Sequence, residues 1–284
     1  MDAGEARKPD PNTDWGGVGG RNWVEAQSLV DEVLRSLEEL LVEPLAAMPS
    51  SRVLDVGCGT GSTTLAAARK LGAEGHCVGI DISEPMLAAA QARIEEAGAP
   101  ASFIQADAQA HEFEPAGFDL VISRFGVMFF EDFAAAFTNL RGAVKPGGAL
   151  RMIAWRGAEH NSFMTTAERA AGHLLPNLPP RQKGGGPGQF AFAEHARVHA
   201  ILEAGGWTGI DIRPTDFACS FPESELARYV SLLGPIGRVL HEADEQTRAK
   251  VVELATAAFE PYIDKDRVRF TAACWLIEAR NAGG

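Results

Sequence analysis

From residue 52 to residue 155 the sequence alternates between short apolar runs and longer amphipathic stretches. The runs RVLDVG, HCVGID, ASFIQAD, FDLVIS and PGGALRMIAW have the length and composition of buried strands, and helical patterns follow the first, second and fourth of them. Strands of this kind separated by helices indicate a parallel sheet that helices cover on both faces. The sequence therefore predicts an α/β fold of the doubly wound type.

The regions on either side of this pattern are more helical. Apolar residues are spaced at helical intervals from Asn22 to Leu41, and a second helical region precedes the last apolar run, VRFTAACWLIEAR. A chain of 284 residues fits one large α/β domain with added helices better than two large domains. We expect an N-terminal arm and helix over residues 1–48 and an α/β domain over 49–284, with a helical insert at about 222–265.

Charge and cysteine usage narrow the classes of partner. With 26 basic and 38 acidic residues the net charge is -12, which disfavours nucleic acid and anionic membranes as partners. The four cysteines form no C-x-x-C pair, and His195 and His199 have no third ligand nearby in sequence, so we predict no disulfide framework and no metal. Charged runs such as EEL at residues 38–40 are expected on solvated helix faces. The N-terminal segment lacks the apolar region of a signal peptide, and no apolar run is long enough for a membrane span, so a cytoplasmic location is expected.

The stretch VLDVGCGTGSTTLAAA, residues 53–68, has the form of a strand, a glycine loop and a helix. Gly57, Gly59 and Gly61 follow the spacing G-x-G-x-G, and ligands of open α/β sheets bind at the carboxyl ends of the strands, where this loop lies. No G-K-[ST] follows, which excludes a P-loop. Asp55 ends the strand, where its charge would repel a pyrophosphate and attract an ammonium or sulfonium group.

Further acids follow the next two strands. Asp81 ends the second strand and can accept hydrogen bonds from both ribose hydroxyls, a feature shared with Rossmann dehydrogenases, although the cap of a helix explains it too. Asp107 follows the third strand and can accept a hydrogen bond from an adenine amine. Acidic residues thus follow three successive strands, and no phosphate-binding lysine accompanies them. This pattern indicates a site for an adenosine compound that carries a positive charge, and S-adenosylmethionine is such a compound.

Together these motifs resemble the class I S-adenosylmethionine-dependent methyltransferases. VLDVGCGTG, GIDISEPML, ADAQ, FDLVISRFGVMFF and LRGAVKPGGAL match the motifs of that family in order, over about residues 50–155. The resemblance implies a seven-stranded, mostly parallel sheet of order 3-2-1-4-5-7-6 with an antiparallel last strand. It also implies S-adenosyl-L-methionine as the cofactor and S-adenosyl-L-homocysteine as its product.

The resemblance further implies cofactor contacts for a set of residues around the motifs. They are Trp23, Gln27, Asp55, Gly57, Gly59, Asp81, Ile82, Met86, Asp107, Ala108 and Ser123. The two glycine backbones are expected beside the methionine part, Asp55 near its ammonium group and the Ser123 backbone at the same amino-acid head. Asp81 is expected at the ribose, Ile82 and Met86 beside the adenine, and Asp107 with the Ala108 amide at the adenine edge.

The N-terminal stretch WGGVGGRNWVEAQ resembles the lid of a small-molecule subgroup of this family, in which an N-terminal helix covers the cofactor. Trp15 and Arg21 are expected to belong to the same lid. That subgroup often has N-P-W after the fifth strand, where this chain has HNSFMTT, so the wall on the substrate side is expected to differ. Residues 1 to about 30 and the loop 179–190 are expected to become ordered when ligands bind.

Aromatic residues and a histidine are the candidates for the acceptor side. Phe125, Phe129, Trp155 and Phe163 can close a dry site and favour a cation near a ring face, and ordinary core packing is the alternative for each. His160 follows the fifth strand and is the candidate general base for a hydroxyl acceptor.

The predicted function is methyl transfer from S-adenosylmethionine to a small molecule or a short peptide, with oxygen, nitrogen and carbon acceptors all open. The acidic composition favours a neutral or cationic acceptor. An NAD-dependent oxidoreductase and a non-catalytic protein that binds S-adenosylmethionine are the alternatives. The sequence does not indicate the oligomeric state.

Overall fold

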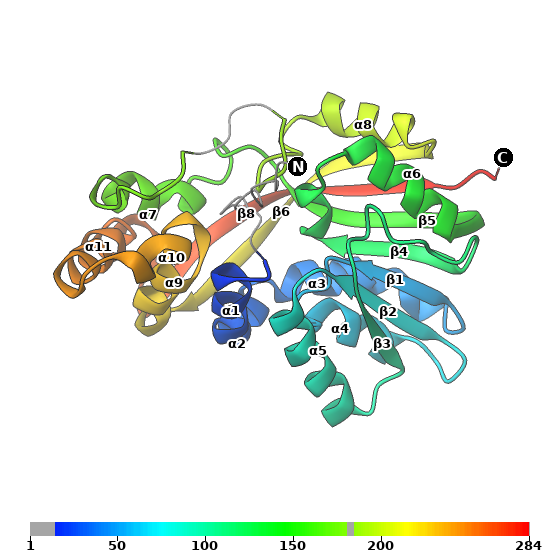
Figure 1. The fold of residues 1–284 in the computed structure, drawn as a ribbon, viewed down its shortest axis with the longest axis horizontal. Helices are drawn as coiled ribbons and strands as arrows, with labels where there is room; N and C mark the ends of the chain where they lie inside the picture. The colour runs from blue at the N-terminus through cyan, green and yellow to red at the C-terminus, as the bar shows by residue number, and fades with distance from the viewer. Residues whose placement is uncertain (1–14, 181–184, 284) are drawn as a thin grey trace, which may run out of the picture.

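The computed structural model describes residues 15–180 and 185–283, arranged around one sheet with the strand order β3-β2-β1-β4-β5-β8-β6 (Figure 1). The strands are β1 (Arg52–Val56), β2 (His76–Asp81), β3 (Ala101–Gln105), β4 (Phe118–Arg124), β5 (Val144–Trp155), β6 (Thr208–Pro222) and β8 (Arg267–Arg280). Strand β8 is antiparallel to β5 and β6, and the pairs from β3 to β5 are parallel. The predicted order is confirmed, with one addition: a two-residue strand, β7 (Ile263–Asp264), pairs with β8.

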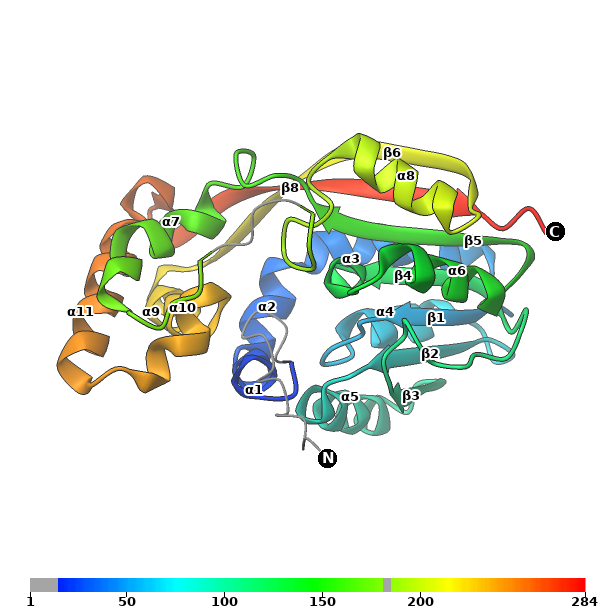
Figure 2. The ribbon, with the colours of Figure 1, turned by 45° about the horizontal axis from the view of Figure 1, so that its top comes forward.

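Helices cover both faces of this sheet (Figure 2). On one face α3 (Arg35–Val42) packs on α4 (Ser62–Lys70), β4 and β5, and α4 also contacts β2 and α5 (Glu84–Ala97). On the other face α6 (Phe133–Ala143) packs on β5 and on α8 (His195–Ala204), which contacts β6. Both faces of the central strands are therefore buried, which explains their nearly continuous apolar sequences.

The N-terminal helices and the helical insert meet beyond one end of the sheet (Figure 1). The N-terminal part is three short helices, α1 (Val18–Glu25), α2 (Gln27–Val33) and α3, and the insert contains α9 (Leu226–Leu232), α10 (Gly234–Val239) and α11 (Glu245–Ala257), with α7 (Phe163–Ala171) packed against it. The side-chain amide of Asn22 donates to the carbonyls of Leu232 at 3.2 Å and Gly237 at 2.8 Å. These bonds hold α1 against the insert.

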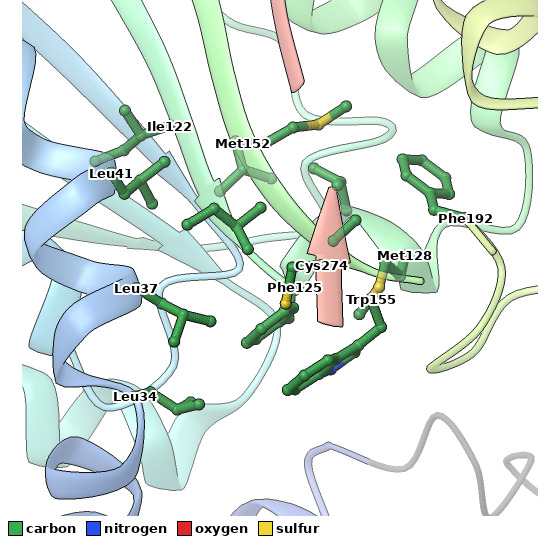
Figure 3. Close-up of a cluster of buried hydrophobic side chains, with 14 of the residues drawn as sticks. Leu34, Leu37, Leu41, Ile122, Phe125, Met128, Met152, Trp155, Phe192 and Cys274 are labelled. Carbon is green, nitrogen blue, oxygen red and sulfur yellow. The ribbon is translucent and has the colours of Figure 1, made fainter. Parts of the chain in front are cut away.

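The core joins the N-terminal helices to the middle of the sheet (Figure 3). Leu37 and Leu41 of α3 are fully buried, and Leu41 lies beside Ile122 of β4. Burying a leucine stabilises the fold by about 1.5 to 3 kcal/mol relative to leaving it exposed. The helix α3 therefore packs into the core of the α/β domain.

Parallel pairing brings the carboxyl ends of four strands to one edge of the sheet. Val56 of β1 pairs with Ile80 of β2, and Asp81 pairs with Gln105 of β3. The loops that follow β1, β2, β3 and β4 consequently lie side by side. Of the segments expected to become ordered with ligands, residues 1–14 and 181–184 lie outside the described residues. In the part of the chain that is described, no helix has the length and apolarity of a membrane span.

Candidate functional site

A cavity of about 280 Å³ lies at this edge of the sheet, between the four strand-end loops and the N-terminal segment. The residues predicted for the site that line it are Trp23, Gly57, Gly59, Asp81, Ile82, Met86, Asp107, Ala108, Phe125 and Phe129. Trp15 and Arg124 line it as well. The structure thus brings these side chains to one place, and their contacts with a ligand stay predictions.

The glycine loop has a left-handed backbone that favours glycine. Gly57, Gly59 and Gly61 have φ angles of +68°, +54° and +78°. A Cβ added to Gly57 would lie 2.5 Å from the Cα of Gly126 in the loop after β4, whereas one added to Gly59 would have only the Met86 sulfur nearby, at 3.7 Å. The close approach of the Gly126 backbone is therefore by itself a sufficient reason for glycine at position 57, and the predicted contact of Gly57 with a ligand stays a prediction.

Asp81 both faces the cavity and holds the loops around it. One carboxylate oxygen accepts the Gly59 N–H at 2.9 Å, and the other accepts the Ser83 N–H at 2.9 Å. Burial raises the pKa of Asp81, and these backbone donors oppose that rise. A carboxylate has about four lone-pair positions, so Asp81 can accept from a ligand in the cavity in addition to these backbone donors.

Asp55 lies beneath the loop and does not line the cavity. It is 1% exposed and accepts a hydrogen bond of 2.7 Å from the Thr64 hydroxyl. Burial raises its pKa to about 7, and the Thr64 bond and the charge of Arg124 oppose that rise. Asp55 can therefore gain or lose a proton near neutral pH and change the charge under the glycine loop.

A partly buried carboxylate from the N-terminal helices lies next to the site, against Arg124. Glu38 of α3 accepts a hydrogen bond from the Ser62 hydroxyl and lies 3.5 Å from the Arg124 guanidinium. Its side chain is only 18% exposed, and burial raises its pKa. The expectation that the acidic run at residues 38–40 is solvated is wrong for Glu38, because α3 packs with this face on the sheet, and correct for Glu39, which is exposed.

Other predicted residues lie away from this cavity. Ser123 is fully buried and donates through its hydroxyl to the Val56 carbonyl at 2.7 Å, and Gln27 is partly buried on α2. Trp155 stacks on Phe125 with ring centroids 4.2 Å apart (Figure 3), and Phe163 stacks on Phe270 at 3.9 Å. These contacts fit the core-packing alternative for Trp155 and Phe163.

The candidate base His160 also lies outside the cavity. Its side chain is 50% exposed, and its ring lies 3.5 Å from the carboxylate of Glu159. No sequence pattern indicates how the turn after β5 is held in place. Asn161 does this: its buried amide donates to the Ala273 carbonyl and accepts the Ala273 N–H, both at 2.9 Å.

Comparison with known proteins agrees with this architecture. Residues 53–148 match the family model described as a methyltransferase domain. An uncharacterized protein of Mycobacterium tuberculosis, Rv1405c, is 35% identical over 152 residues, which is 54% of this chain and 51% of that protein. The ubiquinone/menaquinone biosynthesis C-methyltransferase UbiE of Shewanella frigidimarina is 28% identical over 164 residues, 57% of this chain and 65% of that protein.

Among solved structures, the phosphoethanolamine N-methyltransferase 2 of Haemonchus contortus in complex with S-adenosyl-L-methionine aligns with a TM-score of 0.56 and 18% identity. The alignment covers 93% of this chain and 56% of that one. The chain spans about half the length of the first curated relatives it matches. Residues 53–148 are thus similar to a methyltransferase domain, and the sheet that contains them has the same fold as this solved methyltransferase.

Proposed function

We propose that this protein is an S-adenosylmethionine-dependent methyltransferase that acts on a small-molecule acceptor. The observation that carries the proposal is the cavity at the carboxyl ends of β1 to β4, where a left-handed glycine loop stands beside the carboxylates of Asp81 and Asp107. A phosphate cofactor would meet negative charge there, whereas a ribose, an adenine amine and a cation would each meet an acceptor.

The residues fit the parts of this cofactor one by one. The free lone pairs of Asp81 suit the two ribose hydroxyls, and Asp107, held by the Gln109 N–H at 2.9 Å, suits an adenine edge. Ile82 is 46% exposed although it is a large aliphatic residue, and it lines the cavity with Met86, so the two offer an apolar surface to a flat ring. The acids beneath the glycine loop suit a positively charged group.

The cofactor would supply an activated methyl group, and the protein would supply position and a dry environment. The ring of Trp15 packs edge-on against Trp23 at 5.9 Å and against Phe129 at 5.1 Å, and all three line the cavity. Such a cover excludes water, and alignment of two reactants can lower a barrier by roughly 7 to 11 kcal/mol.

Binding and turnover test this proposal separately. Calorimetric titration with S-adenosylmethionine, S-adenosylhomocysteine and NAD is expected to give binding of the first two and none of NAD. Binding of NAD alone would overturn the proposal in favour of an oxidoreductase. A screen of acceptors with radiolabelled methyl donor then tests catalysis, and binding without transfer to any acceptor would favour a non-catalytic protein.

A further inference from the structure

The strand ends that border the cavity at the glycine loop follow one another in a row. The sheet places β3, β2, β1 and β4 side by side, so Asp107, Asp81 and Gly57 succeed one another along this edge, and Arg124 of β4 comes after them. Neighbouring strands lie about 4.8 Å apart, so the three steps from β3 to β4 span roughly 14 Å. An elongated ligand with its adenine at Asp107 and its ribose at Asp81 would therefore extend over the glycine loop toward Arg124.

The charges along this row differ in sign at its two ends. Arg124 is the only basic residue among the described residues that line the cavity, and the acids there are Asp81, Asp107 and Glu131. The amino-acid head of the proposed cofactor carries a carboxylate besides its ammonium group. Acids repel that carboxylate, whereas a guanidinium attracts it and matches its two oxygens with a planar fork of donors. The charges therefore favour the carboxylate at the β4 end of the cavity.

Contacts with α3 place the Arg124 guanidinium beside the cavity. Its Nη1 lies 3.5 Å from a carboxylate oxygen of Glu38. Glu38 comes one helical turn after Leu34, and the Glu38 N–H donates to the Leu34 carbonyl at 3.1 Å. Leu34 lines the cavity, and residues four apart share one face of a helix, so the guanidinium lies close to that wall.

The ion pair with Glu38 orients this guanidinium without using all of its donors. The same Glu38 oxygen also accepts a hydrogen bond from the Ser62 hydroxyl, and its contact with Arg124 is longer than the 2.7 to 2.9 Å or so of a strong charge-assisted bond. A guanidinium has several N–H donors, so one such contact leaves others for a carboxylate in the cavity. The Arg124 side chain is only 11% exposed, which limits the screening of this interaction by solvent.

The turn that follows Arg124 is strained and fixed on several sides. Phe125 has a φ angle of +70°, a left-handed conformation that is unfavourable for a residue other than glycine. Its N–H donates to the Ile153 carbonyl at 2.9 Å, its ring stacks on Trp155, and the next residue, Gly126, lies against the glycine loop. Strained backbone of this kind persists where the surroundings hold it, and it is concentrated at ligand sites. The position of Arg124 beside the glycine loop is therefore built into the fold.

We propose that Arg124 binds the carboxylate of the amino-acid head of S-adenosylmethionine and makes this carboxylate a requirement for tight binding. The assignment rests on the proposed methyltransferase function. It adds a side chain to a head for which the sequence motifs imply only the backbone of the preceding residue, Ser123. The alternative is a structural role, in which Arg124 only balances the charges of Glu38 and Asp55 and so opposes the rise in the pKa of each. A structural role would affect all adenosine ligands alike.

Two ligands that differ only in the carboxylate test the proposal. They are S-adenosylhomocysteine and its decarboxylated analogue, which keeps the adenosine, the thioether and the amine. Isothermal titration calorimetry on the full chain is expected to show about ten- to a hundredfold tighter binding of S-adenosylhomocysteine. In Arg124→Gln this ratio of affinities is expected to fall below about threefold. In Arg124→Lys it is expected to be intermediate, because a lysine keeps the charge without the planar fork.

Arg93→Gln is the matched control. Arg93 also pairs with a partly buried acid of the N-terminal helices, Asp31 at 2.7 Å, and it donates to the Thr60 carbonyl in the glycine loop at 3.2 Å, but it does not line the cavity. This variant is expected to keep the ratio of affinities even if both ligands bind more weakly. The melting temperature of each variant reports whether it is folded, and the ratio in the unmodified protein tests recognition of the carboxylate without any variant.

The outcomes separate the two proposals. Absence of S-adenosylhomocysteine binding by the unmodified protein overturns the proposed function. Binding of S-adenosylhomocysteine and of the decarboxylated analogue with equal affinity overturns only the carboxylate assignment. A ratio that survives in folded Arg124→Gln overturns the role of Arg124, and so does a ratio that is lost in Arg93→Gln as well, since support of the glycine loop would then explain both.

Discussion

Substitution of Asp81 by asparagine separates its two roles, because this carboxylate supports the loops and faces the cavity. In Asp81→Asn one oxygen is kept as an acceptor, while the amide NH2 group faces one of the two backbone donors, Gly59 or Ser83, that the carboxylate now accepts at 2.9 Å. Leaving a buried N–H without an acceptor costs about 1 to 3 kcal/mol. Removing a desolvated charge offsets part of this, because burial raises the pKa of Asp81 and so disfavours its ionised form.

We therefore expect a loss of about 1 to 2 kcal/mol in the free energy of unfolding, and a larger effect on cofactor affinity. Loss of charged hydrogen bonds to a ribose costs about 1.5 to 3 kcal/mol, which corresponds to roughly ten- to a hundredfold weaker binding of S-adenosylmethionine. Urea denaturation measures the first quantity and isothermal titration calorimetry the second.

Asp119→Asn is the matched control for this experiment. Asp119 also accepts a backbone N–H from a neighbouring strand, that of Arg52 at 2.8 Å, and it bonds to Lys145 at 2.7 Å, but it does not line the cavity. This variant is expected to lose stability and keep its affinity for S-adenosylmethionine. If folded Asp81→Asn binds the cofactor as tightly as the unmodified protein, Asp81 does not contact the ribose.

Three further predictions concern other parts of the site. In the folded protein Asp55 has a pKa of about 7, against an ordinary value of 3.8, so the folded state holds this proton more tightly than the unfolded state. The resulting stabilisation is complete below pH 3.8 and is lost as the pH rises through 7. In urea denaturation between pH 4 and 8 the unmodified protein should therefore lose stability relative to Asp55→Asn, and a constant difference in the free energy of unfolding would contradict this. Gly57→Ala should lower the melting temperature more than Gly59→Ala. Both substitutions cost about 1 to 2 kcal/mol because of the positive φ, and the alanine at position 57 also collides with Gly126. Equal melting temperatures of the two variants would refute the steric argument. Trp23→Ala should weaken S-adenosylhomocysteine binding about two- to tenfold in calorimetry, through the lost aromatic contact with Trp15, and an unchanged affinity would remove this helix from the cover of the site.

The sheet was predictable because its strands have recognisable patterns within their own short sequences. Apolar runs, glycine turns and strand-end acids are properties of neighbouring residues, and they predict the meeting of Asp81, Asp107 and the glycine loop at one edge of the sheet, where all three line the cavity. The antiparallel position of β8 has no such local signal, and the family resemblance supplied it.

The features that sequence reasoning missed all depend on contacts across long separations. Glu38 is indistinguishable in sequence from its exposed neighbour Glu39, and only the packing of α3 on the sheet separates them. The reason for glycine at position 57 lies in the approach of Gly126 from another loop. Arg238 lies over the ring of Trp15, more than two hundred residues earlier, and no spacing rule in the sequence connects the two.

These long-range contacts join the N-terminal cover of the cavity to the helical insert. Asn22 joins α1 to the carbonyls of Leu232 and Gly237 in the insert, and Arg238, the residue after Gly237, packs on Trp15. A ligand that orders the N-terminal cover should therefore also order the insert, because the same backbone carries both sets of contacts.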